Sequence, residues 1–524
     1  MVFAIHAEAI ITKGRDEDMK RYFGWLVLAI IMHLNTNALA GGVDSQGREL
    51  YRDGEVIVKY RSDVKRTRAE MLEIYDRLGV VAVKRMGGIN KNFEHLSFRL
   101  DSRVEEVVEE LSRNPAVEYA QPNYMVYALP ITEEAMPPKT GAKQPCLIPG
   151  LPFPPGCDDS GGGEPPPGGT PCLIPGLPFP PGCDDSGGGG GGGGGGERPA
   201  IQPAPAEPAA AVDPDLSKTY GVKKVQAPEA WAIQRGSKDI VVAVIDTGID
   251  YNHPDLAFNV WRNPAAKNFA RTGIDPNGDE ITGDVVGWDF THNDNLPFDD
   301  HMHGTHCAGT VGAVGNDGVG ISGVAQRVSI MGVKFLTKEG SGTTLDAIKS
   351  IDYAVSRGAR ILSNSWGGKG DDGNNQALED SIKRAEAKGV LFVAAAGNDS
   401  TNNDRDPAFP ASFRVANMLS VAATNEADSM ASFSNYGKET VHVGAPGAGI
   451  YSTTPNNGYN KLSGTSMAAP HVSGAAALVW AQFPTATYTE IKRRLMEHGD
   501  AIPALTDKTV SGKRINVFKA ITGN

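Results

Sequence analysis

The sequence predicts an α/β protein in which a doubly wound, mainly parallel sheet forms a large C-terminal domain, preceded by a small α+β ferredoxin-like unit and a Gly/Pro-rich linker. Downstream of residue 213, continuous apolar segments such as DIVVAVID and VLFVAAAGN alternate with amphipathic segments such as NQALEDSIKRAEAKG. Strands that are buried on both faces have continuous apolar sequences, and the helices between them cover the two faces of a parallel sheet. Upstream, residues 54–127 follow the order strand, helix, strand, strand, helix, strand.

The first 40 residues form a predicted secretory signal region. A basic pair at 20–21 precedes an apolar run that ends near residue 34, and small residues close the segment at Ala40, after which we expect cleavage. Acidic residues before Met19 fit a signal poorly, so Met19 is the expected start. The apolar run is shorter than the roughly 20 residues that span a bilayer, which favours a secreted protein (extracellular, periplasmic or at the cell surface) over a single-pass anchor.

The small unit at residues 50–129 is predicted to be a separate domain. Its second helix carries Val104, Val107, Val108 and Leu111 at helical spacing, and the glutamates between them are expected mostly to face solvent. The formal net charge of the whole chain is -12, which argues against a nucleic acid as the main partner, because binding phosphate needs a basic face.

Residues 130–212 are predicted to be a linker rather than a domain. The stretch PCLIPGLPFPPGCDDSGGG begins at Pro145 and recurs unchanged from Pro171, before a polyglycine run and an Ala/Pro-rich tract. In a secreted chain, one disulfide within each copy is the simplest pairing, although cross-pairing between the copies and a role as a wall or partner ligand stay open. The four cysteines concerned are Cys146, Cys157, Cys172 and Cys183.

Three stretches of the region from residue 213 onward carry side chains suited to catalysis. Asp246 ends the first apolar strand, although an aspartate there is more commonly a structural residue of a turn. The segment HMHGTHCAG holds three histidines and Cys307, which suit either a metal site or a catalytic base. Ser466 stands at the start of a small-residue helix that is apolar almost all round. A serine at a helix N-terminus has backbone N–H groups beside it, which a developing oxyanion requires.

Five motifs in order, DTGID, HGTHCAG, SNSWGG, AAAGN and GTSMAAP, resemble those of the subtilisin-like serine peptidases, in particular the thermitase and proteinase K branch. The resemblance covers residues 213–524, and the order Asp, His, Ser differs from that of chymotrypsin-like enzymes and α/β-hydrolases. It implies a subtilisin-like catalytic domain and a serine endopeptidase that works through an acyl-enzyme. A catalytically inactive binding or adhesion protein with the same fold is the alternative, which the presence of every catalytic residue disfavours.

The resemblance assigns the catalytic residues by position. Ser466 is the implied nucleophile, His303 the general base, and Asp246 the group that holds the tautomer of His303. Asn398 is the implied side-chain donor to the oxyanion, together with the backbone N–H of Ser466. Cys307 is implied to be a buried spectator thiol. A zinc enzyme built on the histidine cluster is a further alternative, but it lacks another well-placed ligand.

Substrates are implied to lie extended between two backbone segments, while a third segment forms the wall of the pocket for the residue before the scissile bond. Trp366 is bulkier than the aliphatic residue often found there, so it either shapes this pocket or packs in the core. The two segments are Gly340, Ser341 and Gly342 and Ser365, Trp366 and Gly367, and the wall is Ala395, Ala396 and Gly397.

The small unit resembles the inhibitor-type propeptides of these peptidases. The resemblance implies a monomeric precursor in which the propeptide templates folding and its tail blocks the cleft, ending near residues 127–129. Pro130 disfavours cleavage directly after Leu129, so the first cut is expected elsewhere in the linker.

Structural calcium is the implied cofactor, bound by oxygen ligands on loops. Resemblance to the thermitase-like branch implies one site of carboxylates and backbone carbonyls. The loop IDPNGDEITGD is a second candidate, unless it is merely an acidic surface loop, and WDFTHNDN is a third. The first site comprises Asp213, Asp255, Asp317 and the carbonyls of Val314, Val319 and Ile321; the second comprises Asp275, Asn277, Asp279 and Asp284; the third comprises Asp289 and Asp294.

Overall fold

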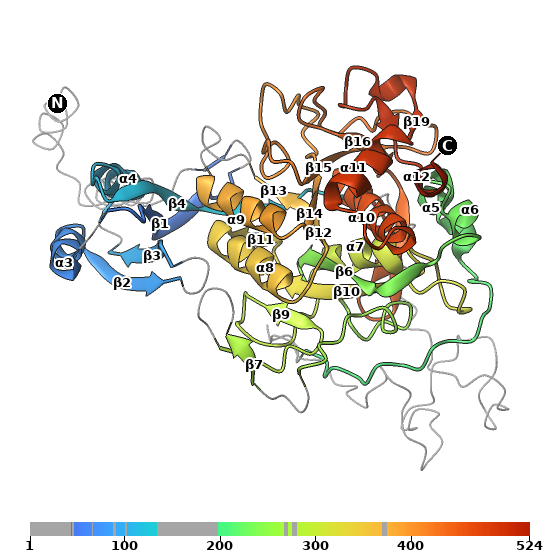
Figure 1. Ribbon diagram of the computed structural model, residues 1–524, viewed down its shortest axis with the longest axis horizontal. Coiled ribbons are helices and arrows are strands. Elements are labelled where there is room, and N and C mark those ends of the chain that lie inside the picture. The colour runs from blue at the N-terminus through green and yellow to red at the C-terminus, as the bar shows by residue number, and fades with distance from the viewer. Residues whose placement is uncertain are drawn as a thin grey trace, which may run out of the picture.

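The computed structural model consists of a large domain built on a nine-stranded sheet and a small domain that projects from one side of it (Figure 1). The described residues are 43–44, 47–64, 67–86, 91–99, 102–133, 198–266, 271–274, 280–368 and 375–523. Within them, no helix is long and apolar enough to cross a membrane. The predicted signal region, the four linker cysteines and three predicted calcium ligands (Asp275, Asn277 and Asp279) lie outside the described residues.

The large sheet is parallel apart from one edge strand. Neighbouring strands from β9 to β20 run parallel, and β19 pairs antiparallel with β20. In spatial order the strands are β9 (Gly287–Asp289), β10 (Arg327–Lys334), β6 (Gly236–Asp246), β12 (Ile361–Asn364), β14 (Leu391–Ala395), β15 (Met418–Thr424), β16 (Val443–Pro446), β20 (Lys513–Arg514) and β19 (Asp500–Ala501). The predicted mainly parallel sheet is confirmed.

Helices cover both faces of this sheet. The buried helix α10 (Thr465–Gln482) packs with α7 (His303–Gly312) on one face, and α8 (Thr344–Ser356) and α9 (Gln376–Ala387) lie on the other. The first face also carries α5 (Tyr220–Lys224), α6 (Ala227–Trp231), α11 (Tyr488–Glu497) and α12 (Val517–Thr522). The sheet is therefore doubly wound.

The continuous apolar run of β6 follows from this two-sided burial. Val242 and Val244 pack into the core beside α10, whereas Val241, Ala243 and Ile245 pack into the core beside α8 and α9. Successive side chains of a strand point to opposite faces, so a strand with two apolar neighbours needs no polar alternation.

The small domain has the predicted β-α-β-β-α-β order. Its elements are β1 (Tyr51–Tyr60), α3 (Arg68–Arg77), β2 (Val80–Arg85), β3 (Phe93–Phe98), α4 (Val104–Ser112) and β4 (Val117–Ala128). The strands pair antiparallel in the order β4-β1-β3-β2. In α4, Val104, Val107 and Leu111 are buried, as the helical spacing predicts.

Strand β4 connects the small domain to the large one. Its end pairs antiparallel with β11 (Ser341–Thr343) and β13 (Trp366–Gly367) of the large domain. Gln121 Oε1 accepts the N–H of Ala377 at 2.9 Å, and Asn123 Oδ1 accepts the N–H of Leu345 at 3.0 Å. The first N–H groups of a helix lack partners within the helix, so these two side chains complete the N-termini of α9 and α8.

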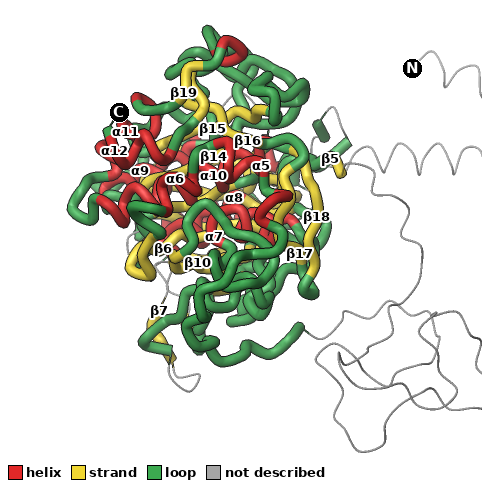
Figure 2. Tube along the Cα trace, turned by 90° about the vertical axis from the view of Figure 1, so that its right-hand side faces the viewer, coloured by secondary structure: helices red, strands yellow, loops and turns green. Residues whose placement is uncertain are grey.

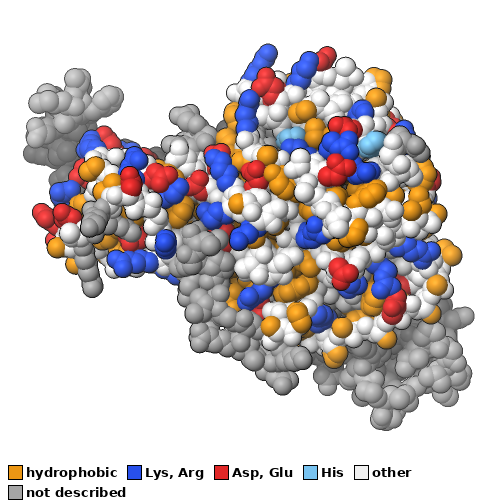
Figure 3. Space-filling model, viewed as in Figure 1, with side chains coloured by type: hydrophobic (Ala, Val, Ile, Leu, Met, Phe, Trp, Pro, Cys, Tyr) orange, Lys and Arg blue, Asp and Glu red, His pale blue; other side chains and the backbone are white. Residues whose placement is uncertain are grey.

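Smaller sheets complete the large domain. The strands β7 (Arg271–Ile274) and β8 (Glu280–Thr282) form one hairpin, and β17 (Ile450–Thr454) and β18 (Gly458–Ser463) form another. The short strand β5 (Thr132–Glu133), which follows the small domain in the chain, adds to β18 as a third strand (Figure 2). On the face seen in Figure 3, basic and acidic side chains are interspersed over both domains.

Candidate active site

A buried carboxylate and a buried imidazole meet where β6 ends and α7 begins. Asp246 is the last residue of β6 and His303 the first of α7. The Nδ1–H group of His303 donates to Asp246 Oδ1 at 2.7 Å, and both side chains are fully buried. Burial by itself lowers the pKa of His303, but the charge and hydrogen bond of Asp246 outweigh it, so the pKa is raised. Nε2 is left as the ring atom able to accept a proton, and it has no hydrogen-bond partner among the described residues.

Ser466 lies in the first turn of α10, beside this pair. Its hydroxyl donates to the backbone carbonyl of Ser365 at 3.1 Å, so its proton does not point at His303. The hydrogen bond between nucleophile and base that the resemblance implies is therefore not formed in this state. Catalytic hydrogen bonds are often loose before substrate binds, and they tighten in the complex with substrate.

Two neighbours of His303 in the histidine cluster, His306 and Cys307, are structural. Possible ligand atoms of Asp246, His303 and Cys307 lie within 4.8 Å of one another. Burial, however, raises the pKa of the Cys307 thiol well above its ordinary value, so the sulfur stays protonated and is a poor metal ligand. Burial also lowers the pKa of His306 to about 3, and its Nε2 lies 2.9 Å from the carbonyl oxygen of Ile450. The neutral ring therefore serves as a hydrogen-bond donor in the core.

Asp299 shapes the turn that precedes His303. Its carboxylate accepts the hydroxyls of Thr247 and Thr305 at 2.8 and 2.6 Å and the backbone N–H groups of residues 301, 302 and 305 at 2.8–3.0 Å. Met302 consequently adopts a left-handed conformation with φ of 101°, which is strained for a residue with a side chain. Asp299 was not predicted from the sequence, although the Asp-Asp pair before HMHGTHC was a visible signal.

The amide oxygen of Asn398 is held in place by Thr465, and the amide nitrogen donates into the cleft. Its Oδ1 accepts both the backbone N–H and the hydroxyl of Thr465 at 2.8 Å. Its Nδ2 donates to the backbone carbonyl of Pro130 at 2.6 Å. Asn398 therefore turns its amide donor toward the chain segment that lies in the cleft.

The end of β4 occupies the groove between the two predicted substrate-binding segments. In the ladders, Val126 pairs with Gly342, and Tyr127 pairs with Ser341 and Gly367. Farther along, the Ala128 N–H donates to the carbonyl of Gly340 at 2.7 Å. This extended segment binds between β11 and β13 as a middle strand, which is how the resemblance implies a substrate would bind.

Leu129 is the tail residue at the predicted pocket. Its N–H donates to the Ser365 carbonyl at 3.4 Å, and it lines a pocket with Gly367 and the wall residues Ala395, Ala396 and Gly397. Trp366 does not line this pocket. Its ring is fully buried in the core and meets the ring of Phe335 edge to face at 5.0 Å between centroids. Of the two interpretations of Trp366, core packing is therefore the one that the structure supports.

The first predicted calcium site brings three carboxylates together. Asp213 accepts the N–H groups of Asn316 and Asp317 at 2.9 Å, and Asp255 Oδ2 accepts that of Ile321 at 2.8 Å. Asp255 Oδ1 is buried without a hydrogen-bond partner among the described residues. Burial, and then the neighbouring charges of Asp317 and Asp213, raise the pKa of Asp255 to about 8. A cation at this position would reduce the repulsion among the three carboxylates and would give Asp255 Oδ1 a partner.

Asp284, predicted as a ligand of the second calcium site, has a different partner. Its carboxylate accepts Arg357 Nε at 2.8 Å, the hydroxyl of Tyr353 at 2.9 Å and the amide of Asn263 at 2.8 Å. Calcium binding by Asp284 stays a prediction. In the structure this buried carboxylate balances an arginine and accepts two further donors, so its charge is met without a metal ion.

Asp289 and Asp294, predicted as the third calcium site, also contact an arginine. The Arg198 guanidinium donates to Asp289 Oδ2 at 2.8 Å and to Asp294 Oδ1 at 3.1 Å. Arg198 lies about 90 residues upstream in the predicted linker, and its role was not predicted from the sequence. In the structure an arginine of the chain itself therefore meets the charge of these two carboxylates, and calcium binding by them stays a prediction.

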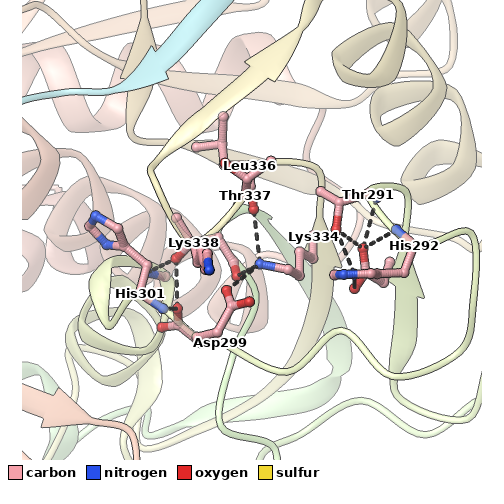
Figure 4. A network of polar contacts seen from close by, with 12 residues as sticks. Thr291, His292, Asp299, His301, Lys334, Leu336, Thr337 and Lys338 are labelled. Atoms are coloured by element: carbon pink, nitrogen blue, oxygen red, sulfur yellow. Dashed lines mark hydrogen bonds and ion pairs between the residues drawn. The ribbon is translucent and has the colours of Figure 1, made fainter. Parts of the chain in front are cut away.

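A fully buried lysine ties the strand ends of the site together. Lys334, the last residue of β10, donates from Nζ to the carbonyls of Thr247 and Leu336 at 2.7 and 2.9 Å and to Asp300 Oδ1 at 2.7 Å (Figure 4). These contacts use all three ammonium hydrogens. They connect the residue after Asp246, the loop before His303 and the segment leading to β11. A charged residue at the end of the apolar segment VSIMGVK was the only sequence signal for this role.

Two family models match the chain. A model described as the subtilase family matches residues 237–512, and a model described as the fervidolysin N-terminal prodomain matches residues 38–123. Thermitase from Thermoactinomyces vulgaris is 39% identical over 305 residues, which cover 58% of this chain and 96% of thermitase. The thermophilic serine proteinase of Bacillus sp. strain AK1 is 37% identical over 303 residues, with 58% and 67% covered. Subtilisin-like protease 1 of Plasmodium vivax is 35% identical over 298 residues, with 53% and 46% covered.

Replacing Lys334 by methionine is expected to destabilise the large domain by about 3 kcal/mol, because it leaves two carbonyls and a carboxylate without their buried donor. The thermal midpoint of the full chain should fall by about 5 °C or more. Lys338→Met is the matched control, since Lys338 is 71% exposed and pairs only weakly with Glu339 at 3.7 Å. Equal midpoints for the two variants would contradict the role assigned to Lys334.

Proposed function

The chain belongs to the subtilase family, and we propose that it is a secreted serine endopeptidase made as a self-inhibited precursor. The family matches identify a subtilisin-like serine-type endopeptidase with an N-terminal prodomain. The observation that carries the proposal is the buried hydrogen bond between Asp246 and His303 beside Ser466, with the end of the prodomain lying across them.

Ser466, His303 and Asp246 form the proposed catalytic triad. His303 Nε2 takes the hydroxyl proton as Ser466 Oγ attacks the substrate carbonyl, and the imidazolium then gives that proton to the leaving amine. The buried carboxylate of Asp246 keeps the other ring proton on Nδ1 and stabilises the imidazolium. Water hydrolyses the acyl-enzyme by the same steps, with His303 again acting first as base and then as acid.

Asn398 is the proposed side-chain donor to the oxyanion. Thr465 fixes the amide plane by donating twice to Oδ1, so that Nδ2 faces the reacting carbonyl without reorganisation. The backbone N–H of Ser466, in the first turn of α10, is the second proposed donor. Donors that are already oriented stabilise developing charge more than solvent can.

The prodomain tail is the proposed inhibitor. It occupies both ends of the cleft. At one end β4 pairs with β11 and β13, and at the other end β5 pairs with β18. Substrates need the same backbone groups, so this tail and a substrate exclude each other. Prodomain contacts at the N-termini of α8 and α9 add to its affinity.

The register of the tail supports the proposal that it resists cleavage. The ladder and the pocket give Leu129 the position of the residue before the scissile bond, which makes Leu129–Pro130 the bond to be cut. The Asn398 amide, however, donates to the carbonyl of Pro130, one residue farther on. Cleavage after Leu129 would have to break a bond to the imide nitrogen of Pro130, while the proposed oxyanion donor Asn398 contacts the next carbonyl along. We therefore place the activating cut elsewhere.

Calcium is the proposed structural cofactor at Asp213, Asp255 and Asp317, with the carbonyls of Val314, Val319 and Ile321 as further ligands. The buried, unpaired Asp255 Oδ1 supports a cation there. Bound calcium would neutralise the three carboxylates and fasten the loop around residues 314–321. We further propose a monomer exported by the signal region of residues 1–40, with protein or peptide substrates.

Ser466→Ala is expected to lower the kcat for casein hydrolysis by at least about 10,000-fold and to stop self-cleavage, because the nucleophile is lost. Asn398→Ala should cost about 100- to 1,000-fold, a magnitude taken from subtilisin, a member of the same family. Ser473→Ala is the matched control, since the hydroxyl of this buried serine of the same helix hydrogen-bonds to Ser363 and Ala469, away from the proposed triad. Undiminished hydrolysis by Ser466→Ala would refute the triad.

Pro130→Ala is expected to make the tail a substrate, because an ordinary amide then follows Leu129. N-terminal sequencing of the secreted products should find a new terminus at residue 130 in this variant and not in the wild type. Ile131→Ala serves as control, since it shortens a neighbouring tail residue while keeping the imide bond. A wild-type terminus at Pro130 would contradict the proposed resistance.

Chelation of calcium is expected to lower the thermal midpoint of the wild type, because three carboxylates are left to repel one another. In Asp255→Asn the difference between the midpoints with and without chelator should largely disappear. Asp284→Asn should be less stable but keep that difference, since Asp284 pairs with Arg357. A wild-type midpoint that chelator does not change would refute the site.

A further inference from the structure

Residues 198–212, called the strap below, lie against the large domain, although the sequence predicts them to be linker. The hydroxyl of Tyr251 donates to the carbonyl of Pro199 at 2.5 Å, and the Asn252 amide donates to that of Ala200 at 2.9 Å. At the other end, the Ala211 N–H donates to the carbonyl of Asn316 at 2.9 Å. The strap is therefore fastened at both ends to the domain that follows it.

Arg198 begins the strap and inserts its guanidinium into the loop of residues 289–296. Nη1 donates to Asp289 Oδ2 at 2.8 Å, to Asp294 Oδ1 at 3.1 Å and to the carbonyl of Leu296 at 3.0 Å, while Nη2 pairs with Asp294 Oδ2. The Asp289 side chain is fully buried, and that of Arg198 is 22% exposed. The Arg198 guanidinium thus makes four contacts with three residues of the loop.

The oxygen atoms that surround Arg198 are the kind that bind a hard cation. Two carboxylates and a backbone carbonyl converge on one point, and the fully buried Asp289 needs a positive charge beside it. The second oxygen of Asp289 accepts the N–H and the hydroxyl of Thr291 at 2.8 and 2.7 Å, which fixes the loop (Figure 4 shows Thr291 and His292). A metal ion and the guanidinium would need the same oxygens and repel each other, so only one can be present.

We propose that the loop of residues 289–296 is a cation site whose occupant is Arg198 of the chain itself, and that the strap therefore remains part of the mature enzyme. The guanidinium supplies the charge without depending on calcium in the medium. Being covalently linked, it also acts at a high effective concentration. Removing it would leave Oδ2 of the buried Asp289 with His292 as its one remaining partner among the described residues, and the site would accept a divalent cation.

The second half of this proposal rests on the proposed maturation of the peptidase. A cut after Arg198 would release the guanidinium from its loop, whereas a cut before it leaves the strap intact. We therefore expect the activating cut between Glu133, the last residue of β5, and Arg198.

The first half is tested without any peptidase activity. Arg198→Gln is made in the Ser466→Ala full chain, and bound calcium is counted by equilibrium dialysis alongside the parent. The variant should bind one more calcium ion per chain, and its thermal midpoint should fall by about 4–8 °C in chelator and recover with calcium. Glu207→Gln is the matched control, since Glu207 pairs with Arg327 on the exposed part of the strap and should change neither quantity.

An unchanged number of calcium ions in Arg198→Gln, with a midpoint that calcium does not restore, would overturn the assignment of a cation site. Sequencing the N-terminus of active wild-type enzyme tests strap retention and does not require the variant to fold. A terminus at or before Arg198 is expected, and a stable active form that begins after it would overturn retention. Failure of the Ser466→Ala chain to lose activity would refute the proposed function instead and leave the calcium count interpretable.

Discussion

The hydrogen bond between His303 and Asp246 depends on the end of β6 staying where it is, and much of the polar structure nearby keeps it there. The backbone carbonyl of Asp246 accepts the N–H of Phe335 at 3.1 Å, so the neighbouring chain fixes it. Lys334 holds the next carbonyl, and Asp299 holds the hydroxyl of Thr247 and the turn before His303. A two-sided apolar sheet leaves polar groups only at its strand ends. The site's precision therefore comes from charged residues buried at that edge.

The sequence was enough to predict the elements and the catalytic motifs, because both depend on neighbours in the chain. Burial on two faces gives β6 its continuous apolar run, and each of Asp246, His303 and Ser466 lies within its own short motif. Lys334, Asp299 and Arg198 were not predicted. Their roles arise where distant segments meet: Arg198 contacts a carboxylate 91 residues away. The tail places Leu129 in the pocket but the carbonyl of Pro130 at the Asn398 donor. This register of the tail in the cleft is likewise encoded by no motif.

The calcium predictions illustrate the same limit. Asp255, Asp284 and Asp289 all lie in acidic or polar loops, and all three are fully buried in the fold. A buried carboxylate needs a compensating charge or donors, and the chain supplies them in different ways. Asp284 has Arg357 from the C-terminal end of α8, Asp289 has Arg198 from the strap, and only Asp255 keeps an unpaired buried oxygen. Acidic residues thus indicate where a cation is needed, but not which cation meets the need.

The positions of the tail and the strap bear on how inhibition could be released. Residues 134–197 connect two segments that are both bound to the large domain, β5 on one side and Arg198 on the other. While this connection is intact, the tail binds within one molecule and competes at a high effective concentration. A cut within it changes the inhibitor into a separate molecule that dilution can remove, while the strap and its cation stay behind. One break in the connecting residues would therefore separate inhibition from stability, two properties that the precursor needs together and the mature enzyme does not.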